Sequence, residues 1–200
     1  MSYRTYTVHE LAKDGKLSIL KQILDDKPEL LNERDSKDLH CLHIAAYTGD
    51  LAVANELIRR GANKDLLRAD GMSPMLIAAM RGTPPHAALV VALAKQGANV
   101  NLQGPMGYTV LHFLCMKGLL DAVRALLQPA VGAMINRRTN EQSTPLHAAV
   151  TGNHLELALL LIKEGADKNA QNKQGKTPLM CLKGKEGEAN RRAVLEALER

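Results

Sequence analysis

The densest group of chemically capable side chains is the tetrapeptide His-Cys-Leu-His at residues 40–43. Imidazole and thiolate are the ligands that zinc prefers, and His40 and His43 are three residues apart, so they could share one helical face. A closed structural zinc site needs four ligands, and no fourth ligand is indicated near this tetrapeptide. We therefore expect no metal here, and we expect no cofactor elsewhere in the chain.

Other residue types that could catalyse a reaction are scattered. Cys41, Cys115 and Cys181 have no CxxC spacing, and they fit the role of small buried apolar side chains. A Cys nucleophile that pairs with a distant His stays open as an alternative. The neighbouring carboxylates Asp25 and Asp26 are expected at a solvated helix end. Because no Gly-rich phosphate loop, Ser nucleophile elbow or His-Glu-x-x-His motif is present, we expect that the chain is not an enzyme.

Basic residues are in slight excess, with a net charge of +5 and a pI near 9.2. Such a charge allows acidic partners without requiring nucleic acid. Pairs of arginines stand at 59–60, 137–138 and 191–192. We assign the first pair to a helix end and the last to a solvated helix face, and the middle pair could contact a partner. Aromatic residues make up only 2%, so the stacking platforms of single-stranded nucleic-acid binders are missing and we expect no nucleic acid.

The segments that direct proteins to membranes are also missing from the sequence. The first twenty residues contain five charged side chains and no apolar run, which is unlike a signal peptide. No stretch is apolar for long enough to span a bilayer. Three cysteines without close pairing are typical of a reducing compartment. We therefore expect a cytoplasmic protein with no membrane partner.

Four histidines share one place in a periodic pattern, and this pattern shows what positions them. His9, His43, His112 and His147 each end a four-residue block, and blocks of this kind recur about every 33 to 36 residues. The blocks are Tyr-Thr-Val-His (6–9), His-Cys-Leu-His (40–43), Ser-Pro-Met-Leu (73–76), Thr-Val-Leu-His (109–112), Thr-Pro-Leu-His (144–147) and Thr-Pro-Leu-Met (177–180). Thr144 suits a helix N-cap and Pro145 the first helical position. We therefore interpret the four histidines as structural residues at helix starts.

A second landmark stays in phase with the first. The sequences GANKD (61–65), GANVN (97–101), GADKN (165–169) and the degenerate GAMIN (132–136) follow the second helix expected in their repeats. Gly61, Gly97 and Gly165 are suited to left-handed helix caps. A period near 33 residues with these two landmarks resembles the ankyrin repeat. The resemblance implies an all-α solenoid of stacked helix-turn-helix repeats, joined by short β-turn fingers, which buries its apolar faces only by stacking.

Six repeats cover the chain as one domain. They are 1–34 (N-terminal cap), 35–67, 68–103, 104–138, 139–171 and 172–200 (C-terminal cap). In the last repeat we expect a mobile loop over 183–188 and a capping helix with Val194, Leu195 and Leu198 as its apolar stripe. We place the three extra residues of the third repeat at Thr83–His86, where Thr83 and Pro84 begin the second helix. We place the two extra residues of the fourth repeat at Gln128–Gly132, and we interpret both insertions as variation in surface loops.

The resemblance also implies a partner surface on the finger tips and the exposed places of each first helix. In the second to fourth repeats these places are apolar with a basic fringe. The predicted partner-binding residues are Leu39, Tyr47, Met72, Met80, Arg81, Met106, Tyr108, Met116 and Lys117. An exposed apolar patch rimmed by charge marks an interaction site. The alternative is that some of these side chains pack between repeats, Leu39 and Met72 above all.

The sequence therefore predicts a monomeric protein-protein interaction module, acting as an adaptor, inhibitor or regulatory subunit. Its concave face should bind another protein through an apolar segment with acidic flanks. Two other classes stay open: a bacterial effector-type or enzymatic protein with an unrecognised site, and a structural protein that associates with itself. The 200 residues leave no length for a separate catalytic domain, which favours the interaction module.

Overall fold

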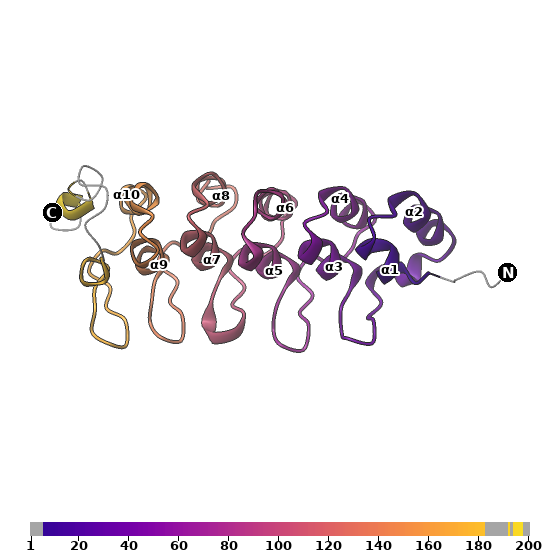
Figure 1. The fold of residues 1–200 in the computed structure, drawn as a ribbon, viewed down its shortest axis with the longest axis horizontal. Coiled ribbons are helices and arrows are strands. Elements are labelled where there is room, and N and C mark those ends of the chain that lie inside the picture. The colour runs from indigo at the N-terminus through magenta and orange to yellow at the C-terminus, as the bar shows by residue number, and fades with distance from the viewer. Residues whose placement is uncertain (1–5, 183–191, 193, 198–200) are drawn as a thin grey trace. The chain divides into compact units, whose positions relative to one another are not determined.

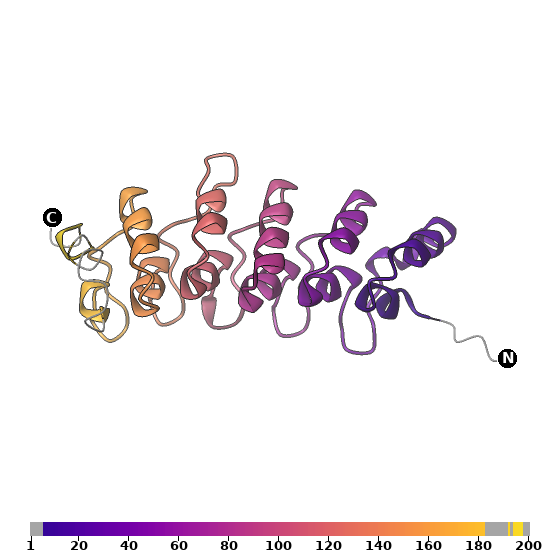
Figure 2. The same cartoon turned by 45° about the horizontal axis from the view of Figure 1, so that its top comes forward.

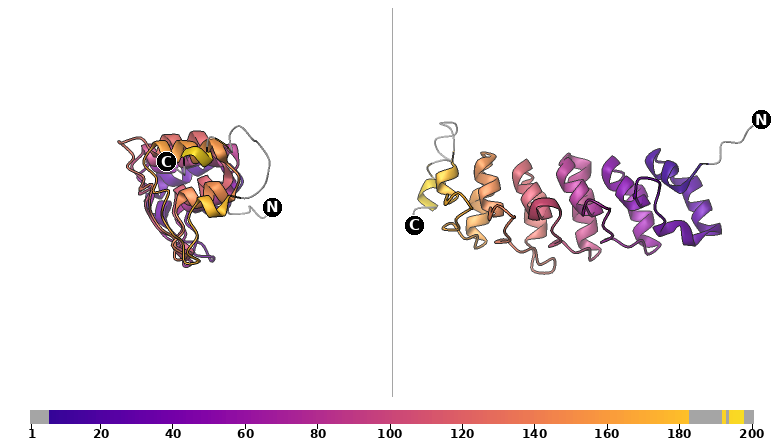
Figure 3. Two further views of the ribbon diagram at one scale, coloured as in Figure 1. Left: turned by 90° about the vertical axis from the view of Figure 1, so that its left-hand side faces the viewer. Right: turned by 90° about the horizontal axis from the view of Figure 1, so that it is seen from below.

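A computed structural model describes residues 6–182, 192 and 194–197 of the chain. It contains two compact units, an N-terminal unit that extends to Asn99 and a C-terminal unit that begins at Val100. Within each unit, the helices form antiparallel pairs in two layers, and the fingers extend from the layer of first helices (Figures 1 and 3). No strand occurs among the described residues, and the predicted all-α class with stacked helix pairs is confirmed.

The N-terminal unit contains three helix pairs. Their first helices form one layer and their second helices the other (Figure 1). The elements are α1 (Val8–Lys13) and α2 (Leu17–Asp26), followed by the 3₁₀-helix η1 (Pro28–Asn32), then α3 (Cys41–Thr48) and α4 (Leu51–Arg59), and α5 (Pro74–Arg81) and α6 (Pro84–Lys95).

The C-terminal unit contains two complete helix pairs and the start of a third. The elements are the 3₁₀-helix η2 (Pro105–Gly107), α7 (Val110–Lys117) and α8 (Leu120–Leu126), α9 (Pro145–Thr151) and α10 (Leu155–Lys163), and the 3₁₀-helix η3 (Leu179–Cys181). The last block, Thr-Pro-Leu-Met, thus forms a 3₁₀ turn instead of a full first helix.

The first helices begin as the four-residue blocks predict. Ser73 accepts a hydrogen bond from the Leu76 amide through its side chain, and Pro74 is the first residue of α5. Thr144 makes the same contact with the amide of His147 at the start of α9. Because these side chains satisfy amides that have no partner inside the helix, the blocks fix where each first helix starts.

Each finger closes on itself through a main-chain hydrogen bond at its base. In every case an amide donates to the carbonyl four residues later, at distances of 2.9–3.1 Å. The pairs are 35 to 39, 68 to 72, 104 to 108, 139 to 143, and 172 to 176. The residue before the closing one has a positive φ, as at Gly71 (φ 80°) and Gln142 (φ 58°). The fingers are therefore tight turns with a left-handed residue before the closing one, and the finger at 104–108 has a second, Met106 (φ 57°).

Neighbouring loops are also joined by side chains that bind main-chain amides one repeat away. In the N-terminal unit, Asn32 accepts from the Asn63 amide at 3.0 Å and Asp65 accepts from the Asn99 amide at 2.9 Å. In the C-terminal unit, Asn136 accepts from the Asp167 amide at 2.7 Å. The predicted glycine caps precede these loops, and Gly61 has the expected left-handed φ of 88°.

The two insertions differ in kind. Thr83 and Pro84 begin α6 as predicted, but the interpretation of the third-repeat insertion as a surface loop was wrong. Gly82 and Thr83 join α5 to α6 just as two residues join α3 to α4, whereas α6 has 12 residues and α4 has 9. The extra residues therefore lengthen the helix by nearly one turn.

The fourth-repeat insertion does lie in a loop. The amide of Ala133 donates to Leu126 seven residues earlier, whereas the equivalent bond from Ala62 reaches Leu57, five residues earlier. The two extra residues thus fall after α8, where the loop extends past the helix end (Figure 2). This outcome confirms the expected position at Gln128–Gly132.

Leucines supply most of the largest fully buried side chains, with Leu57, Leu76 and Leu93 in the N-terminal unit and Leu114 and Leu126 in the C-terminal unit. In the predicted C-terminal capping stripe, Val194 is fully buried and Leu195 is half-buried. Leu198 and the loop expected at 183–188 lie outside the described residues.

Candidate functional site

The histidines of the four-residue blocks join consecutive repeats. The Nδ1 atom of His147 accepts the Thr144 amide at 3.2 Å, and its Nε2 atom lies 3.0 Å from the carbonyl oxygen of Lys176 in the next repeat. His43 makes the corresponding contact with Met72 at 3.2 Å. Since one ring nitrogen accepts an N–H and the other faces a carbonyl, the geometry fits a neutral ring protonated on Nε2.

Burial keeps these rings neutral. His43 and His112 are fully buried, and burial lowers the pKa of each to about 4. Burial also lowers the pKa of His147. A neutral imidazole whose two nitrogens both face main-chain groups has no free position for catalysis or metal binding. His43, His112 and His147 therefore act as structural links, as the sequence predicts. The Nε2 atom of His9 also contacts a main-chain carbonyl, that of Glu33, at 3.0 Å.

A second pair of histidines, which the sequence analysis missed, holds the C-terminal ends of two first helices. His86 places Nε2 3.0 Å from the carbonyl oxygen of Tyr47, and His154 places Nε2 3.1 Å from that of Met116. Tyr47 and Met116 occupy the same place in their repeats. Each contact fixes the backbone of a residue whose own side chain is exposed, 55% for Tyr47 and 40% for Met116.

The tetrapeptide at 40–43 does not form a metal site. The Nδ1 atom of His40 lies 2.8 Å from the carbonyl oxygen of Asn32, and its ring stacks on His43 at 5.3 Å. Cys41 is fully buried, and burial raises the pKa of its thiol to about 12. Throughout the described part of the chain, no three His, Cys, Asp or Glu side chains are grouped so that they could hold a metal ion.

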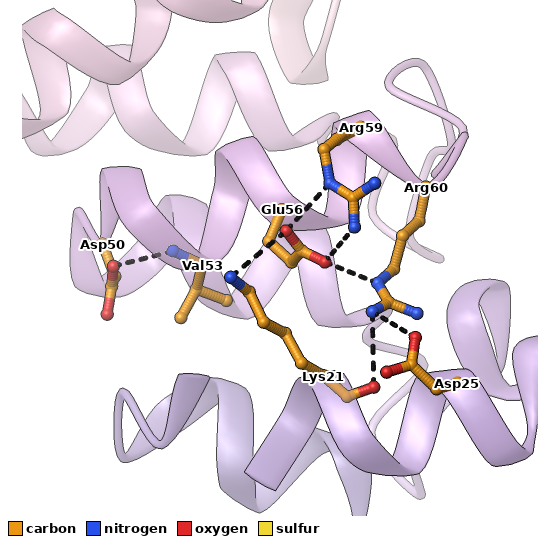
Figure 4. Close-up of polar contacts among 7 residues, drawn as sticks. All are labelled: Lys21, Asp25, Asp50, Val53, Glu56, Arg59 and Arg60. Carbon is orange, nitrogen blue, oxygen red and sulfur yellow. Dashed lines mark hydrogen bonds and ion pairs between the residues drawn. The ribbon is translucent and has the colours of Figure 1, made fainter. Parts of the chain in front are cut away.

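An ion-pair network joins α2 to α4 in the N-terminal unit (Figure 4). The buried carboxylate of Glu56 contacts Arg59 Nη2 and Arg60 Nε, both at 2.6 Å, and Lys21 Nζ at 3.7 Å. Arg60 also reaches Asp25 at 2.7 Å. Hydrogen bonding from Arg59 leads the effects that lower the pKa of Glu56 to about 2. Each charged group of the network has an oppositely charged partner within it, so the network serves to hold the two helices together.

The predicted binding residues of the N-terminal unit have different surroundings. Tyr47 and Met80 are exposed, 55% and 43%, and Arg81 is exposed at the C-terminal end of α5. The guanidinium carbon of Arg81 lies 4.6 Å from the centre of the Tyr47 ring. Leu39 is half-buried. Met72 is only 5% exposed, so its side chain packs inside, as the alternative interpretation held.

In the described part of the C-terminal unit, the large exposed apolar residues are methionines. Met106 is 60% and Met116 40% exposed, and Lys117 is exposed beside Met116. Tyr108 is half-buried, because its ring stacks on Phe113 at 5.3 Å and meets the edge of His112 at 5.8 Å. Met106 has a left-handed φ of 57°, which places it at the tip of its finger.

A cleft of about 1280 Å³ lies in the N-terminal unit. Side chains from α1, the first finger, α3 and α5 line it, among them Leu39, Ile44, Tyr47 and Ile77. The sequence analysis named Leu39 and Tyr47 but missed the contribution of the first repeat. Both apolar and charged side chains line the cleft.

The arginine pair expected in a finger makes contacts within its own unit. Arg137 donates to the Gln103 side chain at 2.8 Å, and Arg138 donates to the carbonyl of Gln171 at 3.2 Å. Both arginines are exposed, and their hydrogen bonds connect neighbouring fingers.

Comparison with known protein families gives the identity of the repeats. A family model described as ankyrin repeats (3 copies) matches residues 8–103, 42–139, 85–172 and 131–187. The chain belongs to the ankyrin-repeat family. Ankyrin repeats are protein-protein interaction modules and in general are not catalytic.

Similar curated proteins have very different names. The putative E3 ubiquitin-protein ligase XBAT31 of Arabidopsis thaliana is 29% identical over 76% of this chain and 35% of its own length. The nuclear factor NF-kappa-B p105 subunit of Gallus gallus is 28% identical over 90% of this chain and 19% of its own. Ankyrin repeat and SOCS box protein 11 of Danio rerio is 37% identical over 54% of this chain and 34% of its own. The chain thus spans about a third or less of each.

Among the residues that the structure describes, no helix is both long and apolar enough to cross a membrane.

Proposed function

We propose that this chain binds another protein through the exposed side chains of its first helices and fingers, with one such surface on each compact unit. In the N-terminal unit the surface comprises Tyr47, Met80 and Arg81, with Leu39 at the cleft. In the C-terminal unit it comprises the residues Met106, Tyr108, Met116 and Lys117. Met72 contributes from below the surface, by packing.

One observation supports this proposal above the others. Tyr47, Met80 and Met116 stand at the same place of three successive repeats, and each is at least 40% exposed. Single exposed apolar residues are ordinary on any protein, whereas recurrence at one place of the repeat marks the same position in both units as a candidate contact. Methionine adapts to irregular surfaces and tyrosine is frequent at binding hot spots.

The chemistry of the surface suggests the chemistry of the partner. Arg81 and Lys117 stand next to Met80 and Met116 in the sequence and are exposed. An apolar partner segment with acidic flanks would complement both features. We propose that the chain acts without catalysis, as an adaptor, inhibitor or regulatory subunit, in the form of a monomer. A cytoplasmic location is in keeping with its free cysteines.

The test compares binding by surface variants of the full chain. Lysate of the source cells would be passed over the immobilised wild type, a Met80→Glu, Met116→Glu variant, and a control Ile19→Glu, Met134→Glu variant. The control changes one exposed apolar residue in each unit, 44% and 52% exposed, outside the proposed surfaces. Circular dichroism would first establish that all three have the same helix content.

A partner that binds the wild type and the control but is lost from the Met80→Glu, Met116→Glu variant is the expected result. A partner retained by that variant would contradict the proposed surfaces. If none binds any form, the enzymatic and self-associating alternatives return, and light scattering over a concentration series would test self-association.

A further inference from the structure

We propose that Arg81 binds a carboxylate of the partner and so selects an acidic segment on the N-terminal unit. This inference rests on the proposed function and adds to it a specificity-determining residue. The ligand is an Asp or Glu side chain next to an aliphatic one in the partner segment. The observation behind it is the stacking of the Arg81 guanidinium on the Tyr47 ring, with 4.6 Å between the guanidinium carbon and the ring centre.

Arg81 differs from the other arginines of its unit. Within residues 6–99, every other arginine has a carboxylate partner in the chain: Arg34 with Asp38, Arg59 with Glu56, Arg60 with Glu56 and Asp25, and Arg68 with Asp70. Arg81 makes no ion pair in this same part of the chain, and its guanidinium lies over the face of Tyr47. Among the arginines of residues 6–99, Arg81 is therefore the one with a carboxylate site free.

Stacking prepares the side chain for such a ligand. An arginine loses conformational freedom when it binds, and part of this cost is removed when a ring already holds the guanidinium. A guanidinium has five N–H donors, and contact with a single ring cannot occupy all of them, so donors stay open to a carboxylate. The backbone of Tyr47, which carries this ring, is held by His86, whose Nε2 atom lies 3.0 Å from the Tyr47 carbonyl oxygen.

The cleft next to Tyr47 supplies the apolar part of the site. Tyr47 lines it together with Ile44 on α3 and Ile77 on α5, and Ile77 stands one helical turn before Arg81. An aliphatic side chain placed against these residues would therefore have its neighbour within reach of Arg81.

The cleft carries charges of both signs. The lining carboxylates of Glu10 and Asp35 accept main-chain amides, from Thr7 at 3.0 Å and from Lys37 at 2.8 Å. The lining cations of Lys13 and Lys37 have no carboxylate partner among residues 6–99. A partner carboxylate near either of these lysines would meet unpaired positive charge.

Two further carboxylates line the cleft without an ion-pair partner in the described part of the unit. They are Asp26, at the end of α2, and Glu33, after η1. Both belong to the segment that precedes the first finger, whereas Tyr47 and Arg81 lie on α3 and α5. The acidic residue of the partner is therefore assigned to the α3–α5 side of the cleft.

The experiment uses a phage-displayed library of random dodecapeptides, selected on the immobilised full chain. Selected peptides would be synthesised with a fluorescent label and titrated against the wild type, an Arg81→Gln variant and a Lys95→Gln variant. Lys95 is exposed and ends α6 as Arg81 ends α5, and it lies outside the proposed surface, so its substitution is the matched control. We expect peptides with Asp or Glu beside an aliphatic residue, about tenfold weaker binding to Arg81→Gln, and unchanged binding to Lys95→Gln.

Two further measurements separate carboxylate binding from a structural role of Arg81. Changing the acidic residue of the peptide to its amide should weaken binding to the wild type about tenfold and leave binding to Arg81→Gln nearly unchanged. Tyr47→Phe keeps the aromatic face and should bind like the wild type, whereas Tyr47→Leu removes it and should bind several-fold more weakly.

The outcomes separate the two proposals. Selected peptides without acidic residues, or equal losses from the amide peptide in both proteins, would overturn the role of Arg81 and leave the binding surface standing. If no peptide binds the wild type more tightly than a Tyr47→Ala, Met80→Ala variant, both proposals for the N-terminal unit fail.

Discussion

The two compact units each carry a tyrosine among the predicted binding residues, and they use it differently. In the N-terminal unit, Tyr47 is 55% exposed and its ring supports Arg81. In the C-terminal unit, Tyr108 is half-buried between Phe113 and the edge of His112. The ring of Tyr47 is thus mostly open to a partner, whereas the ring of Tyr108 is partly taken up by packing.

The difference follows from the place of each tyrosine in its repeat. Tyr47 is the seventh residue of α3, close to its C-terminal end, where side chains point away from the core. Tyr108 closes the base of a finger, since its carbonyl accepts the Gly104 amide at 2.9 Å. A residue at a finger base meets the first helix of its own repeat, and Phe113 on α7 provides a stacking partner there. The place of a tyrosine within the repeat therefore decides how much of its ring stays open to a partner.

Acid should have the largest effect, and it should distinguish the units. A histidine whose folded pKa is lowered stabilises the fold fully above its unfolded value near 6.5, and this contribution is lost as the pH falls toward the folded value. Each fully titrating histidine changes the free energy of unfolding by about 1.4 kcal/mol per pH unit. His112 and His147 lie in the C-terminal unit and His43 in the N-terminal unit. Hydrogen exchange read by mass spectrometry, corrected for intrinsic rates, should show the C-terminal unit losing more stability between pH 6.5 and 4.

Below that range the order should change. Glu56 has a folded pKa of about 2 against an ordinary value of 4.5, so its contribution to the N-terminal unit is lost only as the pH falls from 4.5 toward 2. The control for the histidine effect is a His112→Gln variant, whose side chain does not titrate between pH 6.5 and 4. This variant should show a flatter pH dependence of stability in the C-terminal unit. An equal response of both units down to pH 4 would contradict the assignment.

Glycine substitutions should rank next. Gly118 and Gly49 both have left-handed φ, 70° and 75°, which costs a non-glycine residue about 1–2 kcal/mol. An added Cβ at Gly118 would also meet the His154 ring, with Cε1 at 2.6 Å, whereas at Gly49 the nearest ring atom of His86 is 3.1 Å away. We expect Gly118→Ala to destabilise by about 2–3 kcal/mol and Gly49→Ala by about 1–2 kcal/mol in urea unfolding.

The matched control for these variants is Gly165→Ala. Gly165 has a φ of 90° and no atom within 4 Å of an added Cβ, so its substitution measures the backbone cost alone. A loss for Gly118→Ala no larger than that for Gly165→Ala would show that His154 moves aside without cost.

The tyrosines themselves should show the smallest and most direct contrast. Tyr108→Ala removes two ring contacts from a half-buried site and should lower the free energy of unfolding by about 2 kcal/mol. Tyr47→Ala removes an exposed ring and its contact with Arg81, and should cost less than about 1 kcal/mol. Thermal melting followed by circular dichroism would compare them, with Tyr47→Phe as a control expected to melt like the wild type. Equal destabilisation would mean that Tyr47 also serves packing.

The sequence predicts the regular parts of this fold because the same physical requirement returns in every repeat. Ser73 and Thr144 are recognisable caps, and Gly61 is a recognisable helix end. The extra turn of α6 could not be predicted in the same way. An insertion in a loop and an insertion in a helix change the spacing between the landmarks by the same amount. Only the unchanged connection through Gly82 and Thr83 shows that the helix took up the extra residues.

Parts of the candidate site could not be predicted from the sequence, for a related reason. His86 and His154 reach equivalent carbonyl oxygens, yet His86 is the third residue of α6 and His154 precedes α10. Side chains of the same kind can thus reach one target from different places, and a search for fixed spacing misses them. The sequence gives a weak indication of the contact between Arg81 and Tyr47, because the two residues are one repeat and one position apart.

The side-chain hydrogen bonds that join neighbouring repeats have mostly main-chain atoms as their partners. His43 and His147 reach carbonyl oxygens, and Asn32, Asp65 and Asn136 reach amides. A main-chain atom is the same whatever side chain it carries. Mutations can therefore change the outward-facing side chains one at a time without disturbing the joints between repeats, and a protein built in this way is free to evolve new binding preferences while keeping its frame.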